Sequence, residues 1–362
     1  MLDFTSVLYL GFHHASHTLP CWTQFTVGVP AAMAEPPTAT AVARRIADLV
    51  GCEQSIVGPS TLHLVWDLFT MLASYPITIY LDDGAYPIAR WGVERASAFG
   101  VNVRAFAHHD ADALARMVRR KPEGRPVIVS DGVCTGCGCS APLAAYHEIA
   151  RRYGGLLVVD DTQALGLLGT APDRLTPYGH GGGGSLRRHG LSGPDIILVS
   201  SLAKSFGAPL AALCGSKMTV GHFRRNSDTR VHCSPPSLPA LLAAKRALAM
   251  NDIDGENRRR RLARRVFEFR GRLASEGLRT SGGMFPIQTL SLPAEVDAPG
   301  FHRLLSMKGL RSVLRRGCDG RPAVSLAITA RHHSHDIERA ADIVTRSYAT
   351  LGAVRKGTNY GI

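Results

Sequence analysis

The sequence predicts an α/β fold in which helices flank a mainly parallel sheet of seven strands. From Ser55 onward, short apolar runs rich in β-branched residues alternate with stretches of helical periodicity, which is the pattern of βαβ units around a parallel sheet. The chain has 362 residues, 45% of them hydrophobic and 20% charged, enough for one large and one smaller domain. The predicted strands are 55–57, 77–82, 101–106, 125–130, 155–159, 196–199 and 210–214.

Beyond the predicted sheet, the pattern changes. After Pro235-Pro236 the strand–helix alternation loosens, which predicts a smaller α+β domain with strands at 286–292 and 323–329. We therefore expect an N-terminal arm and helix at 1–50, a large domain at 51–235 and a small C-terminal domain at 236–362. The predicted helices are 39–50, 60–73, 86–98, 110–119, 142–153, 238–250, 256–275, 298–308 and 335–350.

A single lysine follows the predicted strand 196–199. Ile196 to Val199 is an apolar run that leads into two serines, Leu202, Ala203, Lys204 and then Gly207. A lysine beside a buried strand is partly desolvated, which lowers its proton affinity, and a neutral amine can form a Schiff base with a carbonyl. A surface lysine on a loop is the alternative interpretation.

A second strand end carries an aspartate. The apolar run 155–159 leads into Asp160-Asp161, and in open α/β sheets ligands bind beyond the carboxyl ends of the strands. Lys204 could form a Schiff base and Asp160 could pair with a pyridinium nitrogen. These are the two protein groups that pyridoxal phosphate requires.

Three segments resemble motifs of one enzyme family. Val159–Gly169 (VDDTQALGLLG) is similar to V-D-[DE]-A-H-G-x-G-x-x-G, and Ser201–Gly207 (SLAKSFG) is similar to T-x-x-K-x-[FG]-G. Ser130–Thr135 (SDGVCT), followed by Ala141–Leu143 (APL), resembles T-E-[GS]-[VL]-[FY]-S with its downstream A-P-L. All three belong to the α-oxoamine synthases, which include 8-amino-7-oxononanoate synthase and have the type I fold of pyridoxal-phosphate enzymes.

The resemblance implies a role for eight residues. Lys204 would hold pyridoxal phosphate as a Schiff base and then transfer protons, and Asp160 would face the pyridine nitrogen. Tyr86 stands where the family has a ring-stacking histidine, although it could simply pack beneath its loop. The remaining predicted contacts are Gln163 and Thr135 to the ring oxygen or the substrate, and Ser60, Thr61 and Ser201 to the phosphate. Ser60-Thr61 could also be only a helix N-cap.

The sequence departs from the family at two positions. The family histidine that follows the aspartate by three residues is Gln163 here, and an amide cannot transfer protons near neutral pH. Ser325 stands where the family has an arginine for the substrate carboxylate, a group that a guanidinium binds in bidentate fashion. Arg316, Arg321 and Arg331 are the nearby alternatives that we consider.

The sequence is compatible with three functions. The first is the family reaction, in which an amino acid condenses with an acyl thioester. The second is an aminotransferase or another carbanion reaction on an amine, which the two departures favour. The third, against which Asp160 and Lys204 argue, is a non-catalytic binding protein on a transferase fold. The family also implies a homodimer with its active site at the interface.

Composition limits the location and the partners. No apolar run reaches the length of a membrane helix, and the first residues lack a basic n-region. We therefore expect a cytoplasmic protein with no membrane association. The net charge of +13 favours anionic partners such as phosphates, an acyl thioester of CoA or nucleic acid. Much of it lies in an arginine run at 258–265, for which a solvated helix face is the preferred interpretation and nucleic-acid binding is not expected.

Two further segments are unusual. Cys134, Cys137 and Cys139 could hold zinc or form a redox pair, but no second cluster completes a zinc site, so a thiol-rich turn is the preferred interpretation. Residues 178–185 contain four consecutive glycines and are predicted to be a flexible insertion or a lid. Beside it, Arg187, Arg188 and His189 are predicted to be mobile and able to contact an anionic substrate.

Overall fold

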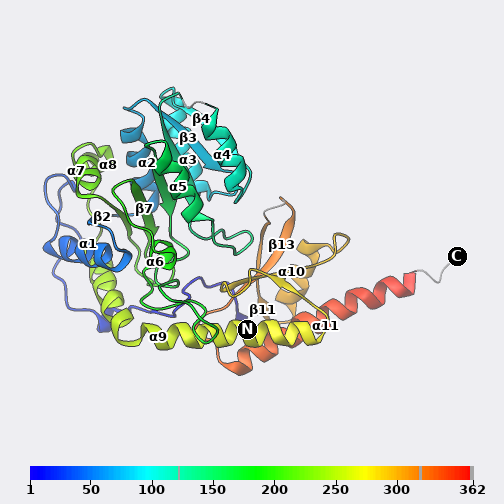
Figure 1. Ribbon diagram of the computed structural model, residues 1–362. Coiled ribbons are helices and arrows are strands. Elements are labelled where there is room, and N and C mark those ends of the chain that lie inside the picture. The colour runs from blue at the N-terminus through cyan, green and yellow to red at the C-terminus, as the bar shows by residue number, and fades with distance from the viewer. Residues whose placement is uncertain (121–122, 318–319, 359–362) are drawn as a thin grey trace. The chain divides into compact units, whose positions relative to one another are not determined.

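The computed structural model describes residues 1–120, 123–317 and 320–358, with side chains described as far as residue 350. The chain forms two compact units (Figure 1). The larger unit consists of residues 12–134 and 140–256. The smaller unit consists of residues 1–11, 135–139 and the chain from Asn257 onward. The three-part division into 1–50, 51–235 and 236–362 stays a prediction.

The larger unit is built on a seven-stranded sheet, as the sequence predicts. The strand order is β2-β8-β7-β6-β5-β3-β4, and β8 alone is antiparallel to the common direction of the other six strands. Each strand lies within two residues of its predicted bounds. The strands are β2 (Gln54–Gly58), β3 (Ile77–Asp82), β4 (Asn102–Phe106), β5 (Arg125–Asp131), β6 (Leu156–Asp160), β7 (Ile196–Ser201) and β8 (Ala211–Gly215).

Helices connect and cover these strands. Their starts follow ordinary capping chemistry: the Ser60 and Asp110 side chains accept hydrogen bonds from the first turns of α2 and α4. The helical segments of the larger unit are η1 (Ser16–Thr18), α1 (Pro37–Val50), α2 (Thr61–Leu72), α3 (Pro87–Ala98), α4 (Ala111–Arg119), α5 (Leu143–Arg152), α6 (Gly184–His189), α7 (Lys217–Arg225) and α8 (Asp228–His232).

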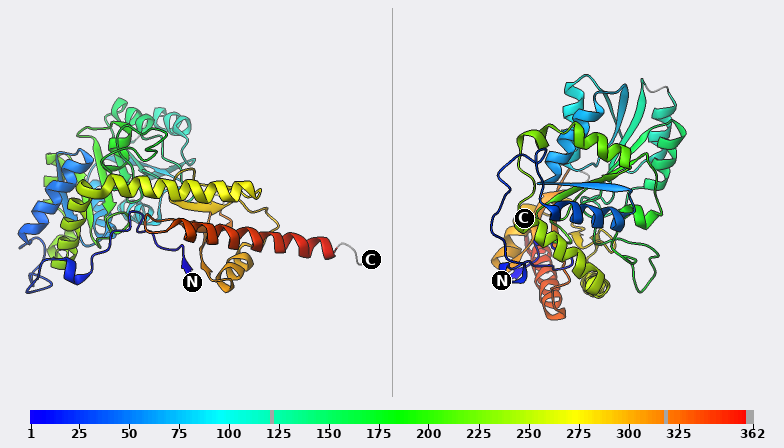
Figure 2. Two further views of the ribbon diagram at one scale, coloured as in Figure 1. Left: turned by 90° about the horizontal axis from the view of Figure 1, so that it is seen from below. Right: turned by 90° about the vertical axis from the view of Figure 1, so that its left-hand side faces the viewer.

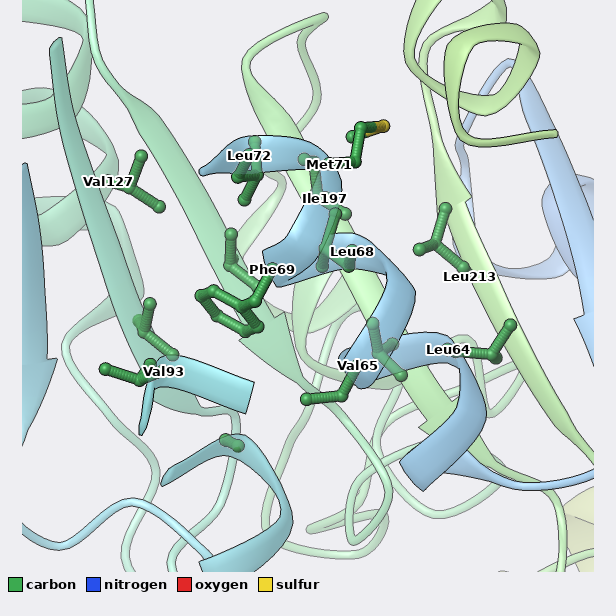
Figure 3. Packing of buried hydrophobic residues seen from close by; sticks show 14 of the residues in the cluster. Leu64, Val65, Leu68, Phe69, Met71, Leu72, Val93, Val127, Ile197 and Leu213 are labelled. Atoms are coloured by element: carbon green, nitrogen blue, oxygen red, sulfur yellow. The ribbon is translucent and has the colours of Figure 1, made fainter. Parts of the chain in front are cut away.

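Helix α2 is packed into the apolar core on one face of this sheet (Figure 3). Leu64, Leu68 and Phe69 are almost fully buried on α2 and lie against Ile197 of β7 and Leu213 of β8. Burying a side chain of this kind contributes about 1.5–3 kcal/mol to folding. The core therefore holds the N-terminus of α2 beside the sheet.

The smaller unit contains two sheets. β1 (Leu2–Asp3) pairs with β11 (Leu310–Arg311) in parallel. An antiparallel sheet has the order β12-β13-β10-β9, so the predicted α+β character is observed. Besides the long helix α9 (Leu238–Ser275), the other elements of the smaller unit are β9 (Thr280–Ser281), β10 (Ile287–Leu290), α10 (Ala298–Met307), β12 (Val313–Arg316), β13 (Pro322–Ala327) and α11 (Ser334–Thr358).

One long helix replaces the two helices predicted at 238–250 and 256–275. α9 extends without interruption from Leu238 to Ser275 (Figure 2), so the predicted break was wrong. The polar residues between the two predicted helices have tertiary partners: Asn251 donates to the Gly181 carbonyl at 2.9 Å, and Asp252 pairs with Arg45. Such contacts offset the cost of about 1 kcal/mol for a glycine, here Gly255, inside a helix.

Among the described residues, no helix has an apolar stretch long enough to cross a bilayer.

The glycine-rich segment is ordered, which corrects the prediction of a flexible insertion. Gly179, Gly181, Gly182 and Gly184 have φ between 72° and 82°, a conformation that favours glycine. Backbone bridges join Thr170 to His180 and Leu165 to Gly183. The glycines therefore allow tight turns that place the start of α6 beside Asp161, the residue after β6.

Arg187 and Arg188 are held in place and are not mobile, contrary to prediction. Arg187 donates to the carbonyls of Asp48 and Leu49 at the end of α1. Arg188 donates to the Pro177 carbonyl at 3.1 Å. These guanidinium groups fasten α6 to neighbouring backbone.

The carboxyl of Asp161, next to the end of β6, is fully buried. Its Oδ2 accepts a hydrogen bond of 3.0 Å from the Ser185 N–H at the start of α6. Burial raises the pKa of Asp161 to about 7, against hydrogen bonds from Ser185 that lower it. A side chain at Gly132 or Gly184 would collide with this carboxyl, so the two glycines make room for it.

We predict that Asp161→Asn changes how stability depends on pH. The folded state holds a proton on Asp161 up to about pH 7, whereas the unfolded state releases it near pH 4. The wild-type free energy of unfolding should therefore fall by up to about 1.4 kcal/mol per pH unit between these values, and this component should be absent in the variant. Denaturant unfolding at several pH values, under identical cofactor loading, measures the difference.

Asp342→Asn is the matched control, because Asp342 is exposed on α11. It should follow the wild-type curve. Parallel pH dependences for the wild type and Asp161→Asn would contradict the assignment of a raised pKa to this carboxyl.

Candidate active site

Four neighbouring strands of the larger sheet end in polar residues. β7, β6, β5 and β3 are adjacent and parallel, and their last residues are Ser201, Asp160, Asp131 and Asp82. Asp131 and Asp160 are directly paired in register. Since parallel strands end at the same edge, these side chains meet where ligands of α/β sheets bind.

Asp160 presents a buried carboxylate at this edge. Its exposed fraction is 9%, and its Oδ1 accepts a hydrogen bond of 3.0 Å from the Thr162 N–H. Burial raises the pKa of Asp160, whereas the hydrogen bonds from Thr162 and the charge of Lys204 lower it. A buried carboxylate of this kind is stabilised by a nearby cation.

Lys204 lies in the turn that follows β7 and is half-buried. Burial lowers the pKa of its amine, and the negative charge of Asp160 acts in the opposite direction. The structure therefore brings Lys204 and Asp160 within electrostatic range of each other. A lysine with a lowered pKa has a larger neutral, nucleophilic fraction.

Thr162 connects the two segments that carry Asp160 and Lys204. Its Oγ1 accepts a hydrogen bond of 3.0 Å from the Ser201 N–H, and the Ser201 Oγ in turn accepts one of 3.2 Å from the Ala203 N–H. The sequence interpretation assigned no role to Thr162. A hydroxyl two residues after an aspartate is a typical local hydrogen-bonding signal that could have identified it.

Ser60 and Thr61 lie at the N-terminus of α2. Ser60 Oγ is 2.9 Å from His63 Nδ1 and 3.5 Å from the His63 N–H, so the N-cap alternative is observed. The N–H groups of a helix start also attract anions. The cap and a phosphate site are compatible, and the phosphate contacts of Ser60, Thr61 and Ser201 remain predictions.

Tyr86 is fixed by its backbone while its side chain remains 44% exposed. The Tyr86 N–H donates to both oxygens of Asp131, at 3.1 Å each. Burial, together with the charge of Asp160, raises the pKa of Asp131 well above its usual value. Asp131 therefore positions the start of α3, a role that the sequence interpretation did not assign.

Asp82 organises the loop before Tyr86. Its carboxylate accepts hydrogen bonds from the Gly84 N–H at 2.8 Å, His108 Nδ1 at 2.6 Å and the Tyr146 hydroxyl at 3.2 Å. Burial alone would raise the pKa of Asp82, but hydrogen bonds such as those of His108 and Gly84 lower it. The hydrogen bond between His108 and Asp82 raises the pKa of His108 to about 10. Asp82 thus acts as a buried anion that holds this loop.

The last two predicted contacts lie apart in the chain. Gln163 is half-buried in the turn after β6, one residue beyond Thr162. Thr135 belongs to the smaller unit.

The chemistry of this edge fits pyridoxal phosphate. Asp160 is a buried carboxylate whose charge a cation would stabilise, and a protonated pyridine nitrogen is such a cation. Lys204 is a partly desolvated amine, as a Schiff-base lysine requires. Ser201, Ser60 and Thr61 offer hydroxyl and N–H groups that suit a phosphate.

In the smaller unit, Arg315 lies beside the serine that stands in the family arginine's position. Ser325 is paired in register with Val313 and Thr289, and its hydroxyl is 2.9 Å from Thr289 Oγ1. Arg315 donates from Nε to Ser325 Oγ at 2.8 Å and from Nη2 to Thr289 Oγ1 at 2.6 Å. A third bond of 2.9 Å reaches the Gly136 carbonyl.

The sequence interpretation considered Arg316, Arg321 and Arg331 but missed Arg315. Residues 313 and 315 share one face of β12 because side chains alternate along a strand. The pairing of Val313 with Ser325 therefore puts Arg315 diagonally beside Ser325. Strand register was the necessary signal, and sequence alone does not supply it.

Comparison with known proteins identifies the family. The family model described as aminotransferase class I and II matches residues 31–342. An 8-amino-7-oxononanoate synthase of Klebsiella pneumoniae (strain 342) is 27% identical over 351 residues, covering 93% of this chain and 87% of that protein. A synthase of the same name from Alkalilimnicola ehrlichii is 31% identical over 218 residues, covering 60% of this chain and 53% of that protein.

Solved structures share the fold. The serine palmitoyltransferase of Sphingomonas wittichii has a TM-score of 0.82 at 16% identity, covering 97% of this chain and 88% of that chain. The 8-amino-7-oxononanoate synthase of Francisella tularensis has a TM-score of 0.74 at 17% identity, covering 97% and 98%. The predicted resemblance and the type I fold are confirmed. The chain therefore belongs to the aminotransferase class I and II family, in which it resembles the α-oxoamine synthases, and it is a transferase that depends on pyridoxal phosphate.

Proposed function

We propose that this enzyme condenses an amino acid with an acyl thioester, with Lys204 and Asp160 as its central residues. The observation that carries the proposal is the pairing of a buried carboxylate and a partly desolvated amine on adjacent strand ends. Thr162 ties these ends together. The relatives named 8-amino-7-oxononanoate synthase support this reaction class.

The predicted residues divide the work of binding the cofactor. Lys204 would hold it covalently through Nζ, and Asp160 would keep the ring nitrogen protonated. Tyr86 would cover the ring, and Ser60, Thr61 and Ser201 would hold the phosphate. Gln163 and Thr135 would donate to the ring oxygen or to the substrate. When bound, pyridoxal phosphate supplies an electron sink for a carbanion at the substrate α carbon.

Proton transfer would rest on Lys204. Its lowered pKa leaves more of the amine neutral, so that Nζ can accept a proton. Gln163 can only orient a group by hydrogen bonding, because an amide does not titrate near neutral pH. The chain therefore relies on one lysine where the family uses a lysine and a histidine.

Arg315 would bind the carboxylate of the amino substrate in place of the arginine that Ser325 replaces. Its guanidinium donates to Ser325 Oγ, Thr289 Oγ1 and the Gly136 carbonyl. These hydrogen bonds orient the guanidinium. Guanidinium groups held in this way favour carboxylates, with charge-assisted hydrogen bonds that are stronger than neutral ones.

A second candidate function is transamination. Gln163 favours it, because the replaced histidine belongs to the condensing enzymes that the chain resembles. In this case an amino acid would convert the cofactor to its pyridoxamine form without an acyl thioester. Titration with single amino acids, with and without an acyl thioester, separates the two functions.

We further propose a homodimer with its active site at the interface, which the resemblance supports. A sedimentation mass of a single chain in the cofactor-loaded protein would contradict it. The cytoplasmic location stays a prediction.

We predict that Lys204→Ala abolishes turnover. Loss of both the covalent link and the proton acceptor should reduce the rate by at least about 10²–10⁴-fold. The visible absorption of the wild-type cofactor should depend on Lys204 and should shift when the correct amino acid is added. Titration with single amino acids, with and without an acyl thioester, measures this.

Lys217→Ala provides the control, because Lys217 is exposed at the start of α7. It should behave as wild type. Turnover of Lys204→Ala at the wild-type rate would contradict the assignment, and bleaching of the wild-type band to the pyridoxamine form would favour transamination.

We predict that Arg315→Ala weakens binding of the amino acid by about 10- to 100-fold, which corresponds to the loss of charge-assisted hydrogen bonds. Amines that lack the carboxylate should bind the variant and the wild type equally. Arg316→Ala, at the exposed neighbouring position, should change neither the binding of the amino acid nor the binding of such amines. Unaltered amino-acid binding by Arg315→Ala, with normal cofactor loading, would remove Arg315 from the site.

A further inference from the structure

In the larger unit, the irregular segment before α1 reaches the turn that carries Lys204. His14 lies in this segment, and its Nε2 is 2.8 Å from the carbonyl oxygen of Phe206, two residues after Lys204. The rings of Phe12 and Phe206 are stacked, with centroids 6.3 Å apart and an interplanar angle of 6°. Two nearby side chains of the segment therefore contact the lysine turn.

The hydrogen bond to Phe206 fixes the tautomer of His14. A carbonyl oxygen can only accept, so Nε2 carries the proton and Nδ1 of the neutral ring is an acceptor. Arg246 of α9 lies on that side, with its Nη1 3.5 Å from Nδ1 and 3.3 Å from the His13 carbonyl. Burial, with the charges of Arg246 and His13, lowers the pKa of His14, against the bond to Phe206 that raises it. His14 is therefore a neutral bridge between α9 and the lysine turn at pH 7.

The Phe206 carbonyl depends on this bridge. Phe206 is 1% exposed, and a buried carbonyl group needs a hydrogen-bond donor. The turn itself is closed elsewhere, by the Ala208 N–H, which donates to the Leu202 carbonyl at 3.1 Å. In the part of the chain that the structure describes, His14 is the sole donor to the Phe206 carbonyl.

The segment before α1 has other attachments to the larger unit. The Ala31 N–H donates to the Cys233 carbonyl at 2.9 Å, and the Phe25 carbonyl accepts from the Leu238 N–H at 2.9 Å. These bonds hold the segment at positions outside the lysine turn. Loss of the His14 side chain would therefore loosen the turn more than it would release the segment.

We infer that His14 is a positioning residue for Lys204. By holding the Phe206 carbonyl, it fixes the backbone from which the Lys204 side chain extends and keeps the amine partly desolvated. The inference rests on the proposed role of Lys204 in holding the cofactor and transferring protons. Accurate placement of such a group matters, because a displacement of about 1 Å can cost about 10²-fold in rate.

The test uses cofactor-loaded enzyme and variants of two histidines. His14→Ala removes the donor to Phe206. His14→Gln places an amide N–H near the position of Nε2, so it should restore most of the wild-type behaviour. His17→Ala is the matched control, because His17 is an exposed histidine of the same segment.

Hydrogen exchange examines the turn without any turnover. The backbone amides of residues 203–208 should exchange about 10-fold faster in His14→Ala than in the wild type and the control, since one hydrogen bond that holds the turn is lost.

The visible absorption of the bound cofactor, followed against pH, reports the protonation of the Lys204 nitrogen. Burial lowers the pKa of Lys204, because it disfavours the charged form. A looser and better hydrated turn in His14→Ala should therefore move the midpoint of this titration to higher pH, by about one unit. A role of His14 in stability alone would lower the unfolding temperature and leave the midpoint unchanged.

Turnover provides the third readout. His14→Ala should lower kcat for the condensation about 10-fold. KM for the amino acid should stay at the wild-type value, because Arg315, the proposed carboxylate site, is untouched. His14→Gln should recover most of kcat.

Unchanged hydrogen exchange and an unchanged titration midpoint in His14→Ala would overturn the inference. An equal effect of His17→Ala would do the same, since it would indicate only a general loosening of the segment. If His14→Ala does not fold, His14→Asn replaces it, because its amide is one methylene shorter than that of His14→Gln. Equal behaviour of these two variants would then overturn the inference. Absence of condensation in the wild type would contradict the proposed function alone, because exchange and absorption require neither substrate.

Discussion

A carboxylate that is buried at the end of a β-strand needs a positive charge nearby, and Asp160 is in that situation. The parallel sheet imposes it, because β6 ends between β5 and β7 at the edge where their loops converge. Lys204, which follows the neighbouring strand β7, supplies part of this positive charge. Burial disfavours the charged form of both groups: it raises the pKa of Asp160 and lowers the pKa of Lys204. One desolvated environment therefore makes Asp160 favour a cation and makes more of the Lys204 amine neutral.

Hydrogen bonds around this pair fix the loops that carry it. Thr162 links the segment after β6 to the segment before Lys204, and Asp131 holds the start of α3. Asp161, one residue beyond Asp160, anchors α6 instead of facing the ligand edge. Two adjacent aspartates therefore have different tasks because successive side chains at a strand end point in opposite directions.

Sequence patterns predicted the sheet, the family and the cofactor pair because these depend on local periodicity and on short motifs around Asp160 and Lys204. They failed where tertiary partners decide the outcome. Asn251 and Asp252 lie between the two predicted helices, yet they have partners within one continuous helix α9. The glycines near 181 read as a mobile loop, but their backbone groups are paired with distant segments. Arg315 was missed because its place beside Ser325 depends on strand register.

The two carboxyls at the ends of β5 and β6 would link cofactor loading to the protonation of Asp131. The charge of Asp160 contributes to the raised pKa of Asp131, whose oxygens hold the Tyr86 N–H. A cation bound at Asp160 removes that contribution, so Asp131 releases its proton more readily and becomes a stronger acceptor. By reciprocity, release of the Asp131 proton would favour the loaded enzyme by the same factor. The apoenzyme and the holoenzyme should therefore differ in proton count as well as in cofactor content.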